Sequence, residues 1–228
     1  MGGCTMKGIK ACVFDAYGTL FDVNSVARAA RDVLGNNWLP LSELWRMKQL
    51  QYTWLRSLIG KHADFWQVTE DALDFAMSSF AINDVSLRNR LMNLYLGISA
   101  YPEVTDTLIR LKTKGIKLAI LSNGTPQMLA SAVNNSRLAQ LFDAILSVEE
   151  VGIFKPHPSV YQLAMDRLSV TQEEVCFISS NGWDAFSAKA FGFRVIWCNR
   201  LSQVKERIPE APDGEIRDLS ALPDCLVC

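Results

Sequence analysis

The chain has 228 residues, of which 49% are hydrophobic and 21% are charged, and its formal net charge is −1. This length suits one good-sized domain or a core with a smaller insertion. A nearly neutral chain lacks the basic face that nucleic acid requires, and it has no apolar run near the roughly 18 residues of a membrane span. We therefore expect neither nucleic acid nor a membrane as a partner. Because the N-terminus lacks a signal-peptide pattern, we expect a cytoplasmic protein.

The first predicted element is a short apolar strand at residues 9–14, which leads directly into Asp15 and a turn at Gly18. No convincing strand follows until residue 100. Helical periodicity recurs instead over residues 41–58, 64–80 and 85–95. In the first of these helices the pattern places one side of the helix toward the interior, with Leu50 and Trp54 beside it; that side consists of Leu44, Met47, Gln51, Leu55 and Leu58.

After residue 101 the pattern changes to short apolar strands that alternate with helices. The predicted strands are 116–121, 143–148, 175–179 and 193–197, and the predicted helices are 104–114, 158–168 and 183–191, with a further start at Pro126. Residues 208–215 read as a surface loop. Such alternation is typical of a parallel sheet covered on both faces. We predict an α/β, doubly wound, Rossmann-like core (1–21 and 101–228) with an inserted helical cap domain (22–100).

The cysteines and histidines suggest neither a metal nor a disulfide. Cys12, Cys176 and Cys198 fall inside strand-like runs, where a free cysteine is a small buried hydrophobe. His62 and His157 lie in predicted turns, with no third group that would complete a catalytic triad. We therefore predict no metal and no cofactor.

Polar side chains follow several predicted strands. They are Asp15, Ser122, Asn123, Ser179, Asn181 and Asp184. Because the carboxyl ends of parallel strands meet at one edge of the sheet, we expect these side chains to line a single cleft. Lys155 precedes Pro156 in a loop and is expected to join them.

These residues also resemble a known set of motifs. The motifs are Asp-x-Tyr-Gly-Thr-Leu-Phe-Asp at 15–22, Leu-Ser-Asn-Gly at 121–124, Lys-Pro at 155–156 and Ser-Ser-Asn-x-Trp-Asp at 179–184. In this order they resemble the haloacid dehalogenase superfamily, and more narrowly the (S)-2-haloacid (L-2-haloacid) dehalogenases. The segment 44–58 is similar to the cap helix of that family. The resemblance covers roughly residues 7–200.

The resemblance implies hydrolytic dehalogenation of short (S)-2-haloalkanoic acids to (R)-2-hydroxy acids with inversion. Asp15 matches the nucleophile, which displaces the halide and forms an ester that water then hydrolyses. Thr19 would hydrogen-bond Asp15, and Lys155 would be its charge partner. Asp184 would activate the water or organise Lys155.

The remaining family positions map onto substrate and halide binding. Arg46, helped by Asn181, would receive the departing halide, since a guanidinium carries five donors and a permanent charge. The other matched residues are Ser179 in the catalytic set, Tyr161 as an orienting hydroxyl, Ser122 and Asn123 for the substrate carboxylate, and Tyr17, Leu50, Phe65 and Trp183 for an apolar pocket. Met47 stands where relatives often carry Gln, which would change the polarity of the pocket.

Three alternatives stay open at the level of sequence. The first is a phosphatase of the same superfamily, which would bind Mg²⁺ through carboxylate ligands. It would need a second acidic residue where this chain has Tyr17, and further acidic residues in the last motif, where this chain has only Asp184. The same aspartyl-ester route could hydrolyse another small carboxylate-bearing electrophile. A binding protein that kept the fold is the third reading. The expected partner is a small 2-haloacid, and Trp45 and Trp54 would either serve a homodimer or pack internally.

Overall fold

The computed structural model describes residues 5–227 and is built around a six-stranded parallel sheet. Its strands, in spatial order, are β4 (Ala144–Ser147), β3 (Lys117–Ser122), β2 (Ala11–Phe14), β5 (Val175–Ser179), β6 (Arg194–Cys198) and β7 (Gly214–Ile216). A separate two-stranded parallel sheet joins β1 (Met6–Lys7) to β8 (Leu226–Val227).

The first long strand, β2, lies at the centre of the large sheet. Phe14 is opposite Ile120 of β3 on one side and Ile178 of β5 on the other. All four residues of β2 are buried, as expected for a parallel strand covered on both faces. The strand order reverses at β2, because the chain continues first toward β4 and then toward β7. Ligands of such sheets bind where the order reverses, beyond the carboxyl ends of the strands.

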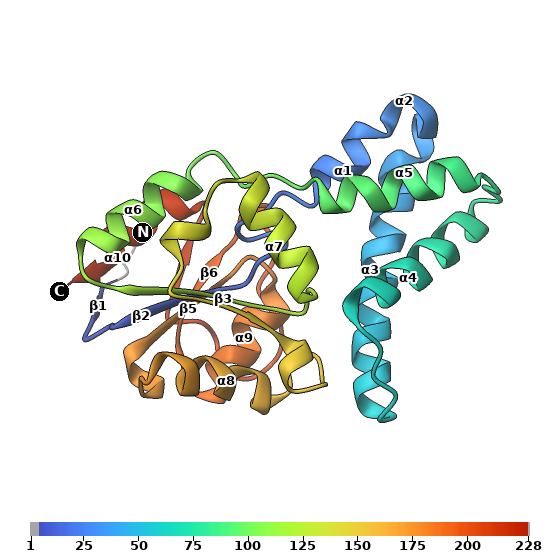
Figure 1. The fold of residues 1–228 in the computed structure, drawn as a ribbon. Helices are drawn as coiled ribbons and strands as arrows, with labels where there is room; N and C mark the ends of the chain where they lie inside the picture. Colours follow the sequence, from blue (N-terminus) through green and yellow to red (C-terminus); the bar gives the residue numbers. More distant parts are fainter. Residues whose placement is uncertain (1–4, 228) are drawn as a thin grey trace.

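Helices cover both faces of this sheet. They are α6 (Val104–Thr113), α7 (Pro126–Asn135), α8 (Pro158–Leu168), α9 (Gly182–Phe191) and the short α10 (Leu222–Cys225). Figure 1 shows α6 and α10 on one face, and α8 and α9 on the other. The predicted α/β fold with a doubly wound, Rossmann-like parallel sheet is therefore confirmed.

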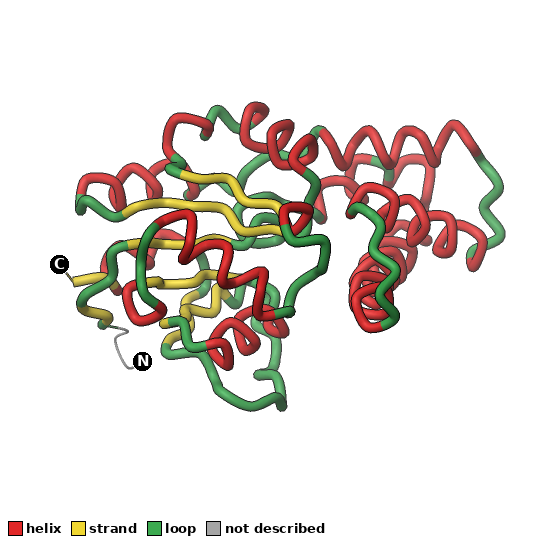
Figure 2. Tube along the Cα trace, turned by 60° about the horizontal axis from the view of Figure 1, so that its bottom comes forward, coloured by secondary structure: helices red, strands yellow, loops and turns green. Residues whose placement is uncertain are grey.

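The remaining helices gather beyond the carboxyl ends of the strands. They are α1 (Asn24–Ala29), α2 (Arg31–Leu34), α3 (Trp38–Leu58), α4 (Phe65–Ser79) and α5 (Val85–Leu96). Figures 1 and 2 show this helical group (α1–α5) beside the sheet, with the long α3 turned toward the core. The chain enters and leaves it side by side, since Asp22 N–H donates to Ser99 O and Tyr101 N–H to Leu20 O.

The buried side of α3 differs from the predicted one. Its buried residues are Leu41, Trp45, Gln49 and Thr53. Met47 and Leu55, expected on the apolar side, are instead 55% and 46% exposed. The reason is the packing of α4 against α3, in which the Trp45 indole N–H donates to the Thr69 carbonyl (2.9 Å). Trp45 is therefore an internal packing residue.

Two further points concern the rest of the chain. The end of the predicted loop at 208–215 is in fact part of a strand, because Gly214–Ile216 pairs with β6 as the edge of the sheet. Among residues 5–227, none of the helices is long and apolar enough to cross a membrane.

Candidate active site

Asp15 lies at the end of the central strand, with its backbone N–H bonded to the carbonyl of Ile178 (2.9 Å). Its carboxylate is buried and has three side-chain partners. Oδ2 accepts from Thr19 Oγ1 (3.1 Å) and from Asn181 Nδ2 (2.8 Å), and Oδ1 accepts from Lys155 Nζ (3.1 Å). These donors come from three different loops, so the fold itself fixes the orientation of the carboxylate.

Lys155 is a buried cation between two carboxylates. Only 1% of the residue is exposed, and Nζ lies 3.1 Å from Asp15 Oδ1 and 2.9 Å from Asp184 Oδ2. Burial works against the charged form, but attraction to Asp15 and Asp184 outweighs it and raises the pKa of Lys155 above its usual value. The site therefore keeps a permanent ammonium group beside Asp15.

Asp184 is fully buried in the first turn of α9. Its Oδ1 accepts from the hydroxyl of Tyr161 (2.8 Å), and its Oδ2 accepts from Lys155. Burial raises the pKa of Asp184, while Lys155 opposes that shift. Burial, followed by the charge of Asp184, also raises the pKa of Tyr161, so its hydroxyl stays protonated and remains a donor. The result is a chain of contacts from Tyr161 through Asp184 and Lys155 to Asp15.

The loop after β5 is joined to the loop after β2. Thr19 Oγ1 accepts from the backbone N–H of Ser180 (2.7 Å), and Ser179 Oγ accepts from the N–H of Asn181 (3.1 Å). Asn181 Nδ2 also reaches the carbonyl of Tyr17 (3.2 Å). Thr19 thus links the two loops, and Ser179 fixes the turn of the second one, so that Asn181 reaches Asp15.

Arg46 brings a second cation to this edge from the helical group. Its Nη2 donates to Asn181 Oδ1 (3.2 Å), and its Nη1 donates to Gln49 Oε1 on the same helix (2.7 Å). Arg46 and Asn181 also line a cavity of about 180 Å³ together with Tyr17. The sequence argument did not identify Gln49, although its position three residues after Arg46 places both on one side of a helix.

The loop after β3 supplies Ser122 and Asn123, both buried. Ser122 Oγ accepts from the N–H of Gly124 (3.1 Å), and Asn123 Oδ1 accepts from the backbone N–H of Lys155 (3.0 Å). Thr125 caps α7 by accepting from Met128 N–H, and Pro126 occupies the first turn. Ser122 and Asn123 therefore stand just before a helix start, where the first backbone N–H groups have no partner within the helix.

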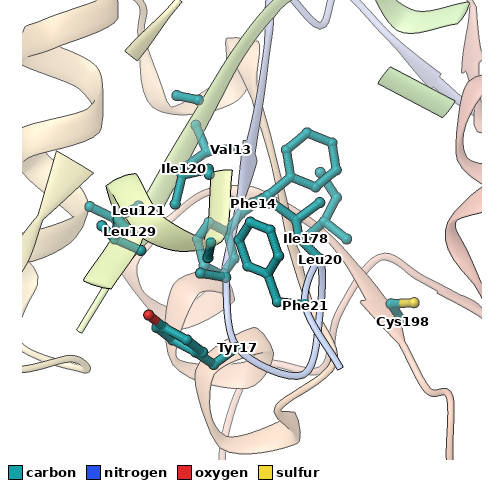
Figure 3. Close-up of a cluster of buried hydrophobic side chains, with 14 of the residues drawn as sticks. Val13, Phe14, Tyr17, Leu20, Phe21, Ile120, Leu121, Leu129, Ile178 and Cys198 are labelled. Atoms are coloured by element: carbon teal, nitrogen blue, oxygen red, sulfur yellow. The ribbon is translucent and has the colours of Figure 1, made fainter. Parts of the chain in front are cut away.

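Gly124 was also missed by the sequence argument, and its role is steric. A Cβ on Gly124 would lie 2.7 Å from Cε2 of Tyr17, so only glycine lets the tyrosine ring occupy its place. Tyr17 lies at the edge of the buried cluster drawn in Figure 3. Its ring centroid is 5.5 Å from that of Tyr95 and 6.2 Å from that of Phe65. Tyr17 and Phe65 thus form an aromatic wall beside Asp15.

Not all predicted pocket residues join this wall. Trp183 packs edge-on against Trp54 at 5.5 Å, and both line a cavity of about 390 Å³ next to Lys155. Leu50 is partly buried on α3, one turn beyond Arg46. The structure therefore places apolar surface on two sides of the site.

Neither histidine contacts Asp15 or Lys155. His62 pairs with Glu149 (2.9 Å between Nε2 and Oε2), and His157 caps α8 by accepting from Ser159 N–H. Within residues 5–227, no three His, Cys, Asp or Glu residues gather in a group that could hold a metal ion. The cation that lies between the carboxylates of Asp15 and Asp184 is the ammonium group of Lys155.

Comparison with known proteins identifies the family. The family model for haloacid dehalogenase-like hydrolases matches residues 9–192. Over 223 residues the chain is 46% identical to (S)-2-haloacid dehalogenase 1 from a Pseudomonas species (strain CBS-3), an overlap of 97% of this chain and 98% of the relative. The chain belongs to the (S)-2-haloacid dehalogenase family. The membership predicted from the motifs is confirmed.

Solved structures of dehalogenases share the fold. A dehalogenase with an intermediate complex superposes with a TM-score of 0.95 at 42% identity, covering 98% of this chain and 99% of the other. The L-2-haloacid dehalogenase from Xanthobacter autotrophicus with chloropropionic acid covalently bound gives a TM-score of 0.88 at 40% identity, with 95% and 97% covered. In the Xanthobacter enzyme, a protein of this architecture thus holds chloropropionic acid covalently.

Proposed function

We propose that this chain hydrolyses short (S)-2-haloalkanoic acids to (R)-2-hydroxy acids through an ester on Asp15. The observation that carries this proposal is the Asp15 carboxylate at the sheet edge, held by three donors and flanked by Arg46, which contacts the same Asn181. A carboxylate fixed in this way can attack carbon, and a guanidinium at its side can receive an anion.

In the first step an oxygen of Asp15 attacks C2 of the substrate from the side opposite the halogen. The new C–O bond forms as the carbon–halogen bond breaks, and the halide leaves with the bonding electron pair, so C2 is inverted. Arg46 donates to the departing halide, joined by Asn181, whose amide N–H is released from Asp15 as that carboxylate loses its charge on forming the ester. Splitting the reaction through a covalent ester replaces one difficult substitution by two easier steps.

In the second step water attacks the carboxyl carbon of the Asp15 ester. Asp184, whose pKa is raised by burial, is suited to accept the proton of that water and also fixes Lys155. The Lys155 ammonium stabilises the negative charge of the tetrahedral intermediate. The acyl C–O bond then breaks, the product oxygen takes the proton, and Asp15 is restored with an oxygen from water.

Substrate binding follows from the loop after β3 and from the aromatic wall. The Ser122 hydroxyl accepts from Gly124 N–H, so its own hydrogen can donate to the substrate carboxylate, together with Asn123 and the N–H groups at the start of α7. We assign the apolar surface for the alkyl group and the halogen to Tyr17, Phe65, Leu50 and Trp183. Neither step requires a cofactor.

The test is halide release. The purified protein in EDTA should release chloride from (S)-2-chloropropionate but not from the (R) acid, and Asp15→Asn should abolish the release. In ¹⁸O water, a single turnover should place the isotope in the Asp15 carboxylate, not in the product hydroxyl. Phosphate release that depends on Mg²⁺, without halide release from any 2-haloacid, would contradict the proposal.

We further propose a cytoplasmic homodimer in which residues 22–100 form a cap domain on a core of 1–21 and 101–228. Support for dimerisation comes from exposed apolar residues of α3 and the turn that follows it, where Leu58 and Ile59 are 82% and 65% exposed. Buried Cys12, Cys176 and Cys198 are thiols outside any disulfide, which suits a reducing compartment. Light scattering of the purified protein measures the oligomeric state.

A further inference from the structure

Gln49 is a polar side chain buried inside the helical group. It lies on the side of α3 that packs against α4, with 1% of its surface exposed. Its Oε1 accepts from Arg46 Nη1 (2.7 Å), and its Nε2 lies 2.7 Å from Thr69 Oγ1 and 3.3 Å from the hydroxyl of Tyr95. A buried amide is costly unless its hydrogen bonds are made, so these contacts restrict how Gln49 can be oriented.

The direction of the hydrogen bonds is set by a backbone carbonyl. Thr69 donates its single hydroxyl hydrogen to the carbonyl of Phe65, one turn earlier in α4 (2.6 Å). Toward Gln49 it can therefore only accept, which requires the N–H₂ end of the amide to face Thr69. The carbonyl end of Gln49 must then face Arg46.

We propose that Gln49 is a positioning residue, oriented by Thr69, that holds the Arg46 guanidinium where the departing halide needs it. This inference rests on the proposed function. Gln49 occupies one N–H of Arg46 and leaves Nη2 directed toward Asn181 at the reaction site.

The neutral amide also preserves the charge of Arg46. The hydrogen bonds of the Arg46 guanidinium go to the neutral amide oxygens of Gln49 and Asn181, so its positive charge is available to an anion. An arginine side chain has many rotamers, and the short contact with Gln49, added to the longer one with Asn181, removes much of that freedom before the substrate arrives.

The experiment compares two leaving groups in single-turnover alkylation of Asp15. Chloride is the poorer leaving group and concentrates charge more than bromide, so it depends more on an aligned guanidinium. We expect Gln49→Met to slow alkylation by (S)-2-chloropropionate about tenfold or more, from the loss of a hydrogen bond to a charged group. The rate with (S)-2-bromopropionate should fall clearly less, so the chloro/bromo rate ratio decreases. The control is Gln51→Met, the same change at an exposed position of α3.

A second pair of variants tests the orientation of the amide without touching Arg46. Thr69→Val removes the nearer of the two acceptors of the Gln49 amide and leaves only the longer contact with Tyr95, so it should lower the chloro/bromo ratio in the same direction. Thr69→Ser keeps the hydroxyl and should keep the wild-type ratio. This pair also decides the question if Gln49→Met does not fold.

Two results would overturn the inference, given an active wild type. One is a folded Gln49→Met variant whose chloro/bromo ratio equals that of Gln51→Met. The other is a Thr69→Val variant whose ratio matches that of Thr69→Ser. A wild-type protein that releases halide from neither acid would instead refute the proposed function itself.

Discussion

Removing Lys155 tests the electrostatic design of the site. In a Lys155→Met variant, Asp15 and Asp184 would remain buried without the ammonium that now lies 3.1 and 2.9 Å from them. Breaking a buried ion pair on one side costs about 3–5 kcal/mol. The loss is limited by protonation, because one carboxyl group can take up a proton and become neutral. Asp184, whose pKa burial already raises, is the one expected to do so.

This limit gives the expected magnitude. Protonating a carboxyl group with an ordinary pKa near 4 costs about 4 kcal/mol at pH 7 and about 1.4 kcal/mol at pH 5, since each pH unit is worth about 1.4 kcal/mol. In the variant the folded protein holds a proton that the unfolded chain releases, so its stability falls as the pH rises. Relative to the wild type, we therefore expect the free energy of unfolding of Lys155→Met to be lower by about 4 kcal/mol at pH 7 and by about 1.4 kcal/mol at pH 5.

Urea unfolding of both proteins between pH 5 and 7, analysed by linear extrapolation, measures this difference. Lys112→Met is the matched control, because Lys112 pairs with Asp143 at a surface where both side chains are more than a third exposed. We expect that variant to lose at most about 1 kcal/mol, with little pH dependence. A destabilisation of Lys155→Met that stays constant from pH 5 to 7 would refute the reasoning that a buried carboxyl group takes up a proton.

Two further variants address the surroundings of Asp184 and Tyr17. Tyr161→Phe removes the donor to Asp184 Oδ1 and should therefore raise the pKa of Asp184 further. The acidic limb of the plot of kcat against pH should then move to higher pH. A limb that does not move would exclude Asp184 as the titrating base. Gly124→Ala places a methyl group 2.7 Å from Tyr17 Cε2 and should destabilise the fold by about 1–3 kcal/mol in urea unfolding. Gly97→Ala, with 3.6 Å of clearance, is its control, and equal losses in the two would contradict the steric argument.

The sequence by itself determined the strands β2 to β6 of the sheet and which polar side chains gather at their carboxyl ends. Apolar runs that end in polar residues identify the strands, and parallel pairing then requires Asp15, Asn181 and Asp184 to meet at one edge, whatever the details of the loops. The start of α7 at Pro126 was likewise readable, since the preference of proline for a first helical position depends only on the local backbone.

Only the tertiary structure decided which side of α3 faces inward. Helical periodicity indicates a helix, but several stripes of α3 carry apolar residues, and contact with α4 buries the one that contains Gln49 and leaves Met47 exposed. The need for glycine at 124 depends in the same way on Tyr17, which is more than a hundred positions away in the chain. Strand ends converge because of local pattern and general topology, whereas the orientation of Arg46 depends on long-range packing that periodicity does not encode.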